Sequence, residues 1–371
     1  YIIATQCTYL EPIANQSYIE ILPGQRYDLL FKSKSAQAVS QDGSGGCYWA
    51  RMESRWRTPA AGGWGLLAYP TCNASALSSF IAAGPPLPPG TSTSNATLLP
   101  PAQFGWIASQ FAPLKWHGAR FTYEVPQDSE VKRQILVSAQ QVQWFGPNTT
   151  VGNGSRWENN GNAFNITDGI KTPLLVSLYT NSTTEPSYER AMQDTPKGYD
   201  NITNTYVAKS GEVFDVVIIN NGSATGHNVE THPWHGHSLK QWTIASGMGN
   251  FSEQALTEAR ASGFKHPIAR DTHTVWPGPG ASSLNQTIPT NSSGGWTVIR
   301  YRVGADGSDA GAWLLHCHFL FHQVMGMALA LVFDAPDIAA ATHFDHDPSY
   351  LSYGHNVTSR WTLEHGHKHH Y

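Results

Sequence analysis

The sequence predicts an all-β protein. Short apolar runs of strand length recur along the chain, and they are bounded by glycine, proline, asparagine and serine, the residues that favour turns. No segment carries a long apolar repeat of 3.6 residues, so any helices are expected to be short and to lie outside the core. With 371 residues, of which 40% are hydrophobic, the chain is long enough for about two domains with buried cores.

The apolar runs place the expected strands, and a change in composition places a domain boundary. The runs are Tyr18–Leu22, Tyr27–Phe31, Cys47–Met52, Gln134–Ser138, Leu174–Leu178, Val213–Ile219, Thr297–Val303 and Met327–Phe333. Short helices are expected only at Tyr188–Gln193 and Ser252–Ala261. Because Ala82–Pro101 is rich in proline, serine and glycine, it is expected to be a loop. We therefore predict a first domain with its linker at 1–124, a second domain at 125–334 and a solvated tail at 335–371.

Charge and hydropathy exclude two broad classes of partner. Charged residues make up 13% of the chain and the net charge is −4, so no basic field for nucleic acid or acidic lipid is expected. No window contains the roughly 20 consecutive apolar residues that a membrane span needs. We therefore expect neither nucleic acid nor a membrane among the partners.

A high density of N-glycosylation sequons predicts secretion. The N-x-S/T pattern occurs at Asn15, Asn73, Asn95, Asn148, Asn153, Asn165, Asn181, Asn201, Asn221, Asn250, Asn285, Asn291 and Asn356. Single sequons arise by chance, but this density favours an extracellular, N-glycosylated protein. The chain also opens on strand-like sequence without the charged and apolar regions of a signal peptide, so a mature form is expected.

The twelve residues from His316 to Met327 carry a run of copper ligands. A cysteine thiolate, two imidazoles and a weak axial thioether form the ligand set of an electron-transfer copper, and Cys317, His322 and Met327 supply three of the four. Met325 is the alternative thioether, which the spacing assigns to the core. On a strand, side chains alternate between faces, so His316 and Cys317 are expected to point to opposite sides.

The missing imidazole has a source about eighty residues upstream, in the segment Thr231-His232-Pro233-Trp234-His235-Gly236-His237-Ser238. Together, H-P-W-H-x-H and H-C-H-x3-H-x4-M resemble the last two copper motifs of the multicopper oxidases, the family of laccases, ascorbate oxidases and ferroxidases. Three further segments resemble this family: Gly211-Glu212-Val213, Gly295–Arg300 and Gly311-Ala312-Trp313. Ile19–Phe31 is similar to the family's middle domain. The resemblance implies cupredoxin-like Greek-key β-barrels, one partial in the first domain and one complete in the second.

The resemblance also implies how the ligands are shared among four coppers per complete enzyme. His232, Cys317 and His322 would bind the type 1 copper with Met327 axial, His235 the type 2 copper, and His237, His316 and His318 the type 3 pair. Electrons from a small-molecule reductant would enter at type 1 and pass through Cys317 to its neighbours His316 and His318. Dioxygen would be reduced to water at the cluster of the other three coppers.

Half of that cluster is missing from this chain. The family uses eight histidines there, and this chain offers His235, His237, His316 and His318, with no other H-x-H pair before residue 232. Because the chain begins where the family's second domain is already under way, we hypothesise that a bound N-terminal fragment supplies the other four histidines. Many relatives also carry an acid at the position of Leu320, so another carboxylate, Asp271 or Glu212 for example, would have to deliver protons.

The cysteines fit this hypothesis. If Cys317 is a ligand, three cysteines remain, which is an odd number for an oxidising compartment. Cys47 and Cys72 flank a predicted hairpin and are candidates for pairing with each other. Cys7 would then be free or joined by a disulfide to the N-terminal fragment.

The function predicted from the sequence is an oxidase for phenolic or enediol reductants, because an axial methionine favours a low-to-middle type 1 potential. A ferroxidase is the alternative within the family. It requires carboxylates near His232 or His322, and the neighbouring sequence is poor in acids. A blue-copper electron carrier without catalytic activity is the alternative from another class.

Overall fold

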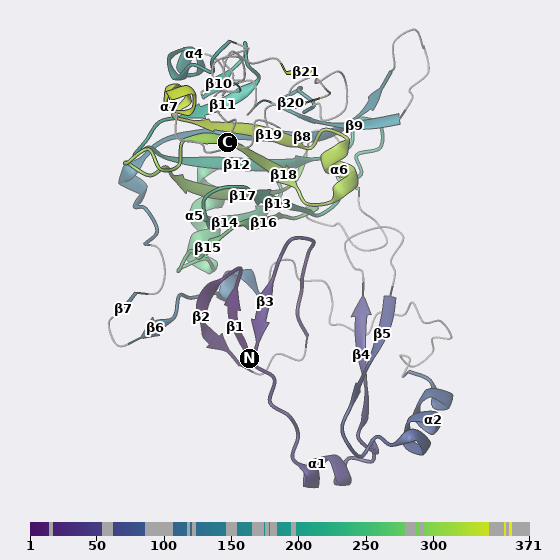
Figure 1. Ribbon diagram of the computed structural model, residues 1–371. Helices are drawn as coiled ribbons and strands as arrows, with labels where there is room; N and C mark the ends of the chain where they lie inside the picture. Colours follow the sequence, from purple (N-terminus) through teal and green to yellow (C-terminus); the bar gives the residue numbers. More distant parts are fainter. Residues whose placement is uncertain are drawn as a thin grey trace, which may run out of the picture.

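The computed structural model describes residues 1–14, 18–53, 62–85, 107–116, 119–120, 124–145, 154–164, 174, 178, 184–193, 198–278, 287–289, 292–340, 352–353 and 356–357. The described chain is built mainly from β-strands with a few short helices, which confirms the predicted all-β class (Figure 1). No strand ladder among these residues crosses residue 125.

Two six-stranded sheets form the larger body of the molecule, the upper part of Figure 1. The first, here the ligand sheet, has the order β10 (Tyr199–Asp200), β11 (Thr205–Ala208), β19 (Ala328–Phe333), β18 (Gly311–Cys317), β13 (His232–Gly236) and β16 (Thr272–Val275). The second, here the opposite sheet, has the order β15 (Ala269–Arg270), β14 (Gln241–Met248), β17 (Ser293–Arg302), β12 (Val213–Asn221), β8 (Val131–Trp144) and β9 (Gly154–Asn159). Ladders β11–β19 and β8–β12 are parallel, and the other pairs are antiparallel.

The main core lies between the two sheets. Alternate residues of β12 and β17 point inward, where Phe214 and Tyr301 stack with ring centroids 5.1 Å apart. The intervening residues, such as Val217 and Trp296, form a second cluster on the other face. Helix α5 (Glu253–Ser262) covers that cluster with Leu256. Both faces of these strands are therefore buried, which explains their continuous apolar sequence.

The N-terminal region forms smaller sheets below this body. Its elements are β1 (Ile2–Thr5), β2 (Thr8–Ile13), β3 (Tyr27–Leu29), α1 (Ala36–Gln41), β4 (Cys47–Glu53), β5 (Gly62–Ala68), α2 (Ala74–Ala83), β6 (Lys115–Trp116) and β7 (Ala119–Arg120). Strands β1–β3 make one sheet close under the body, and the β4–β5 hairpin reaches away from it with α1 and α2 at its far end (Figure 1). A disulfide joins Cys47 to Cys72, as the sequence suggested, and Cys7 is exposed and unpaired.

Two expected strands are wrong, and four helices among the described residues, α1, α2, α6 (Leu320–Val324) and α7 (Ala335–Ala340), were not predicted. Leu174 and Leu178, placed on a strand by their apolar run, are helical in the structure. Tyr18–Leu22 is irregular and belongs to no strand, and its last residue, Leu22, is buried against Trp276. Two of these helices, α1 and α2, are short and expose most of their residues, so no apolar stripe marks them.

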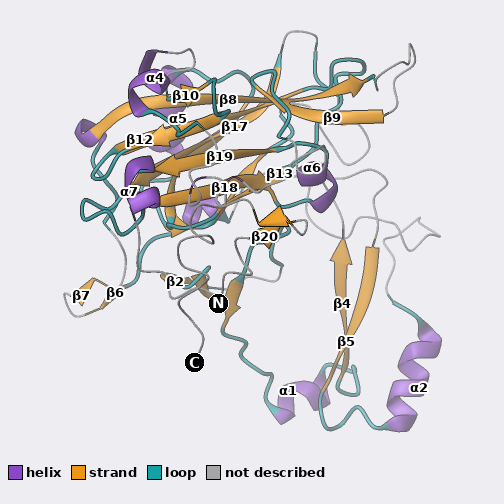
Figure 2. Ribbon diagram, turned by 45° about the horizontal axis from the view of Figure 1, so that its top comes forward, coloured by secondary structure: helices purple, strands orange, loops and turns teal. Residues whose placement is uncertain are grey.

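The remaining helices lie at the rim of the body, as Figure 2 shows. They are α4 (Tyr188–Gln193), which was predicted, α6 (Leu320–Val324) and α7 (Ala335–Ala340). The described chain also forms 3-10 turns at Ala108–Gln110 and Asp128–Glu130. In the predicted tail, β20 (Ser352–Tyr353) pairs with β21 (Asn356–Val357). The histidine-rich terminus from Glu364 lies outside the described residues.

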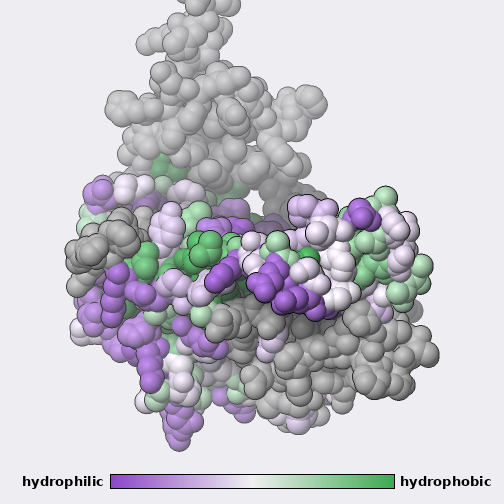
Figure 3. All heavy atoms as spheres, turned by 90° about the horizontal axis from the view of Figure 1, so that it is seen from below, coloured by the Kyte–Doolittle hydropathy of each residue, from purple (hydrophilic) through white to green (hydrophobic). Residues whose placement is uncertain are grey.

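The described surface carries both polar and apolar side chains. No helix among the described residues is both long and apolar enough to cross a bilayer. In the view from below, the described side chains mix hydrophilic and hydrophobic groups over the same face (Figure 3). Large apolar side chains are nevertheless exposed in the N-terminal region, including Leu30, Phe31 and Met52.

Candidate metal centre

Strand pairing brings the two histidine motifs together. Strand β13 carries the first motif and lies antiparallel to β18, which carries the second. In this register His235 lies opposite His316, and Trp234 lies opposite Cys317. Because directly opposed residues share a face, His235 and His316 lie on one side of the ligand sheet and Cys317 lies on the other. The alternation predicted from the sequence therefore separates the ligands into two groups.

The first group consists of His232, Cys317 and His322, whose side chains converge in the core. The Nδ1 atoms of His232 and His322 are 3.1 Å apart, and they lie 3.7 Å and 3.6 Å from the sulfur of Cys317. The centre of such a triangle is about 2 Å from each corner, the length of a bond between an imidazole nitrogen and a divalent metal. All three residues are buried. Two imidazoles and a thiolate at this spacing fit the trigonal ligand set of a blue copper.

The chain after β18 forms a tight loop that places His322 and Met327 next to Cys317. Helix α6 carries His322 back over the strand end, and the carbonyl of His322 accepts a hydrogen bond from Met327 N, 2.8 Å away. The carbonyl of Met327 in turn accepts from Cys317 N at 3.0 Å. Met327 is fully buried in the same apolar cluster as Cys317, whereas Met325 is only half-buried at its edge. The packing thus favours Met327 over Met325 as the thioether beside the thiol.

Trp157 of β9 is a part of this centre that sequence reasoning missed. Its ring lies 4.7 Å from the ring of His232 and 5.1 Å from that of His322, and it is 2% exposed. Its backbone N–H donates to the carbonyl of Met325 at 2.8 Å, so the same residue also holds the returning loop. No motif marks this tryptophan, because its contacts are with residues far away in the chain.

The second group lies on the other face of the ligand sheet. The ligand nitrogens of His235, His237 and His316 all lie within 4.8 Å of one another. His235 and His316 each direct Nδ1 to a backbone carbonyl, that of Asp271 at 2.8 Å and that of Cys317 at 2.9 Å. Because a carbonyl only accepts, each Nδ1 carries the proton, and each Nε2 is left with a lone pair for a metal. The Nε2 atoms of His237 and His316 are 3.2 Å apart.

Burial favours the neutral form of two imidazoles in this group, those of His237 and His316. It lowers the pKa of His316 to about 4 and also lowers the pKa of His237. A metal must displace any proton from its ligand, so a neutral imidazole is the form that binds. His237 and His316 are therefore in the form that can bind a metal near neutral pH.

His318 lies beside this group without joining it. Its ring centroid is 5.8 Å from that of His316 and 5.5 Å from that of His235. Unlike His316, it is exposed. The structure thus brings together seven of the predicted site residues as two groups and a nearby methionine, with His318 at the rim of the second group.

Of the two acids named as proton sources, one lies at the site. The carboxylate of Asp271 is 3.6 Å from Nδ1 of His235 and forms a bidentate ion pair with Arg26 at 2.6–2.7 Å. Burial opposes ionisation, but hydrogen bonds from His235 and Arg26 hold the pKa of this carboxyl well below its usual range. Glu212 is instead buried in an ion pair with Arg133 at 2.7 Å. Leu320 is 68% exposed.

The expectation that no acid lies near His232 or His322 is wrong, because Glu230 lies beside His322. Its carboxylate lies 2.9 Å from Nε2 of His322, on the side of the ring away from Cys317, and it is 27% exposed. The signal was present in the sequence, since Glu230 stands two residues before His232. Its partner His322 lies about ninety residues away along the chain, so the contact was not predictable.

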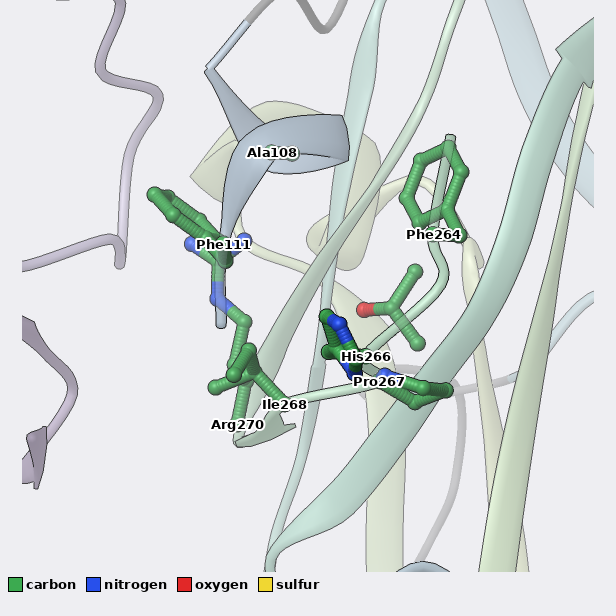
Figure 4. A pocket seen from close by; sticks show the side chains of 8 residues that line it. Ala108, Phe111, Phe264, His266, Pro267, Ile268 and Arg270 are labelled. Atoms are coloured by element: carbon green, nitrogen blue, oxygen red, sulfur yellow. The ribbon is translucent and has the colours of Figure 1, made fainter. Parts of the chain in front are cut away.

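A small hollow elsewhere takes no part in this centre. It lies between the 3-10 turn at Ala108 and the segment before β15, and it is lined by apolar side chains with His266 and Arg270. Figure 4 shows the ring of Phe264 on one side and Phe111 beside Arg270 on the other. The guanidinium of Arg270 lies 5.3 Å from the centre of the Phe111 ring.

Comparison with known proteins agrees with the motifs. The family model described as multicopper oxidase matches residues 170–337. Multicopper oxidase aurL2 from Gibberella zeae is 31% identical over 95% of this chain and 55% of its own length. L-ascorbate oxidase from Cucurbita pepo is 32% identical over 33% of this chain and 18% of its own length. The laccase from Botrytis aclada aligns in structure with 18% identity and a TM-score of 0.46, covering 91% of this chain and 48% of that chain.

This chain therefore spans about half the length of the first curated relatives that it matches. The matched region includes both histidine motifs and the strands that carry them. Residues 170–337 of this chain therefore form a multicopper oxidase domain.

Proposed function

We propose that this protein is a copper-dependent oxidase that takes electrons from a small phenolic or enediol reductant and uses them to reduce dioxygen to water. Copper in the two sites would supply the one-electron oxidation of the reductant and the four-electron reduction of dioxygen. The observation that carries the proposal is the pairing of β13 with β18, which places two sets of ligands on opposite faces of the same two strands. The first group is His232, Cys317 and His322, and the second, here called the imidazole group, is His235, His237 and His316.

The ligand roles proposed here follow the two groups. His232, Cys317 and His322 would hold a type 1 copper, with Met327 as the axial ligand. On the other face, His235 would hold a type 2 copper, and His237, His316 and His318 a type 3 pair. Cys317 is joined by single peptide units to His316 and His318, so the two sites share a short covalent path. This adjacency supports transfer of electrons from one face to the other.

We also propose that another polypeptide segment completes the imidazole group with four further histidines. Two of the four histidines on this face, His237 and His318, are exposed, as are the nearby apolar side chains of Leu320 and Phe321. Exposed imidazoles beside apolar side chains suit a covered interface better than open solvent. The exposed sulfur of Cys7 is the proposed point of a disulfide to that segment.

Two residues beside His322, Glu230 and Trp157, suit this side of the site to the oxidation of a reductant. When Nε2 of His322 carries a proton, it donates a hydrogen bond to the Glu230 carboxylate. The same carboxylate can accept a hydrogen bond from the hydroxyl of a phenol that reaches the outer edge of the His322 ring. Trp157 excludes water from the inner side of both imidazoles. A phenolic reductant would therefore lose its proton and its electron at neighbouring groups.

The same carboxylate supports iron(II) as a second candidate reductant. Ferrous iron is bound by carboxylate and imidazole ligands, and Glu230 places a carboxylate at the outer edge of His322. Oxygen uptake measured with a diphenol, ascorbate and ferrous iron separates these candidates. An enzyme that contains copper but consumes oxygen with none of the three would contradict the proposed activity.

The variant Glu230→Gln tests the proposed role of this acid. We expect kcat/KM to fall about 10- to 100-fold for the preferred reductant, the factor for losing a charge-assisted hydrogen bond of roughly 1.5–3 kcal/mol. Glu130→Gln is the matched control, because Glu130 is exposed and paired with Arg302 on another surface. Equal kinetics of the two variants would remove Glu230 from the substrate site.

Secretion with N-linked glycans is proposed from the sequons. Three sequon asparagines among the described residues, Asn73, Asn201 and Asn250, are exposed, and the Cys47–Cys72 disulfide suits an oxidising compartment. A fall in mass on endoglycosidase treatment of the native protein would be expected. An unchanged mass would count against secretion through a glycosylating pathway.

A further inference from the structure

A loop from the N-terminal region touches the imidazole group from outside. Residues 22–27, here the support loop, connect to β3 and lie against β16 of the ligand sheet. The loop is a tight turn, since Gln25 N donates to the carbonyl of Leu22 at 3.0 Å and Gln25 Oε1 accepts from Leu22 N at 3.0 Å. The Gln25 side chain is buried and donates to Thr274 of β16 at 3.0 Å. The loop is therefore fixed to the strand that flanks β13.

The first contact of the support loop is with His318. Gly24 has a φ of +83°, a conformation that favours glycine. A Cβ atom at this position would lie 2.5 Å from Cδ2 of the His318 ring. The backbone of the loop therefore packs directly against the imidazole, and any side chain at Gly24 would displace it.

The second contact reaches His235 through an ion pair. Arg26 binds both carboxylate oxygens of Asp271, at 2.7 Å and 2.6 Å, and donates to the carbonyl of Gly24 at 2.7 Å. The carbonyl of Asp271 accepts from Nδ1 of His235 at 2.8 Å and from Gly236 N at 2.9 Å. Arg26 therefore holds Asp271 in place, and Asp271 in turn orients the ring of His235.

The β1–β2 turn reinforces Asp271 from the same side. The buried side chain of Gln6 accepts hydrogen bonds at Oε1 from Asp271 N at 3.0 Å and from Thr272 N at 3.1 Å. Both the backbone and the carboxylate of Asp271 are therefore held by N-terminal residues. The support loop thus reaches two imidazoles on this face of the sheet, that of His318 by direct packing and that of His235 through Asp271.

We propose that the support loop is a positioning element of the oxygen-reducing site, holding His235 through the Arg26–Asp271 pair and holding the His318 ring through Gly24. This inference rests on the proposed function for the identity of the metal. Partners that orient a metal-binding histidine typically contribute 10- to 100-fold to metal affinity, so effects of about that size are expected.

The test uses the copper-loaded protein with its native partner segment, and it compares Arg26→Gln with Arg302→Gln. Arg302 forms an exposed ion pair with Glu130 at 2.7 Å, so its loss is a matched control for removing a surface charge pair. The readouts are the type 2 signal in electron paramagnetic resonance and the copper retained against a competing chelator. We expect Arg26→Gln to perturb the type 2 signal and to weaken copper retention about 10- to 100-fold, while the blue absorption is unchanged.

Two further variants separate positioning from folding. Arg26→Lys keeps the charge but not the bidentate geometry, so it should restore retention only in part. Gly24→Ala should disturb the type 3 pair, whereas Gly43→Ala, at a φ of +72° with open space around it, should not. If Arg26→Gln lowers the unfolding midpoint, Asp271→Asn gives the same test with the side-chain shape kept.

The outcomes distinguish the two proposals. If the wild type shows both copper signals and Arg26→Gln behaves as Arg302→Gln does, the support loop has no positioning role. If Gly24→Ala also matches Gly43→Ala, the contact with His318 is only packing. A wild type that holds no type 2 copper would instead contradict the proposed function itself.

Discussion

His235 and His316 face each other directly across the antiparallel strands β13 and β18. Their neighbours Trp234 and Cys317 face each other on the opposite side of the sheet. Since a shift of one residue would exchange the two faces, the register of this single strand pair decides which ligands meet. The two candidate sites therefore depend on each other for their construction.

Replacing Cys317 with serine should abolish the blue absorption, because a hydroxyl is not the soft thiolate donor that blue copper requires. The copper of the imidazole group should be retained, since the rings of His235 and His316 keep their backbone carbonyl partners. Visible absorption combined with metal analysis measures both effects. Cys7→Ser, at an exposed cysteine, is the control and should stay blue. A blue Cys317→Ser variant would refute the assignment.

Met327→Leu should raise the type 1 potential, because removing a donor disfavours the oxidised metal. The two side chains are similar in volume, so the free energy of unfolding should fall by less than about 1.5 kcal/mol. Redox titration of the blue band gives the potential. Met325→Leu serves as the control, since that residue lies at the edge of the cluster. An unchanged or lower potential for Met327→Leu would argue against an axial role.

Gly326→Ala should destabilise the protein more than an ordinary glycine substitution. Gly326 has a φ of +109°, and a Cβ there would lie 2.7 Å from the carbonyl oxygen of Trp157. Strain of this kind is worth roughly 1–3 kcal/mol, and the variant should also shift the blue band by moving the returning loop. Gly161→Ala, at a φ of +80° with open space around it, supplies the backbone strain without the clash. Equal unfolding free energies of the two variants would show that the contact with Trp157 is unimportant.

His273 should make the fold sensitive to acid. Burial lowers its pKa to about 3, and its ring is held neutral between Thr243 at 2.7 Å and Gln241 at 3.2 Å. Below pH 6.5 the unfolded chain binds a proton that the folded protein does not, so this residue's contribution to stability is present above pH 6.5 and is lost as the pH falls toward 3.

The loss should approach about 1.4 kcal/mol per pH unit over that range. We therefore expect His273→Gln to show a smaller fall in unfolding free energy between pH 7 and pH 5, by roughly 1–2 kcal/mol. Denaturant unfolding at the two pH values measures it. His266→Gln, at an exposed histidine, should behave like the wild type. If the unfolding free energy of His273→Gln fell between pH 7 and pH 5 by as much as that of the wild type, the proposed role of His273 would be wrong.

The sequence was sufficient for the all-β class, for six of the eight expected strands and for the ligand motifs, because all of these rest on local patterns. The alternation of His316 and Cys317 and the short spacing to His322 are properties of neighbouring residues, and the structure brings them together as expected. Helix α2 also carried a local signal that was not used, since Asn73 caps its first turn and Gly84 follows its last.

The contacts that surround the ligands could not be predicted in this way. Trp157 meets His232, Arg26 meets Asp271, and Glu230 meets His322, each across a long stretch of chain. Such pairs depend on the order of strands in the sheets, which apolar periodicity does not encode. The fold class was therefore readable from the sequence, whereas the surroundings of the site required the structure.

The measurement that tests the central claim most directly is a copper count on the protein purified with its native partner segment, combined with electron paramagnetic resonance. Two sites built on opposite faces of β13 and β18 predict about four coppers per functional unit, with separate type 1 and type 2 signals. A single copper with a type 1 signal alone would contradict the account and would identify the protein as an electron carrier.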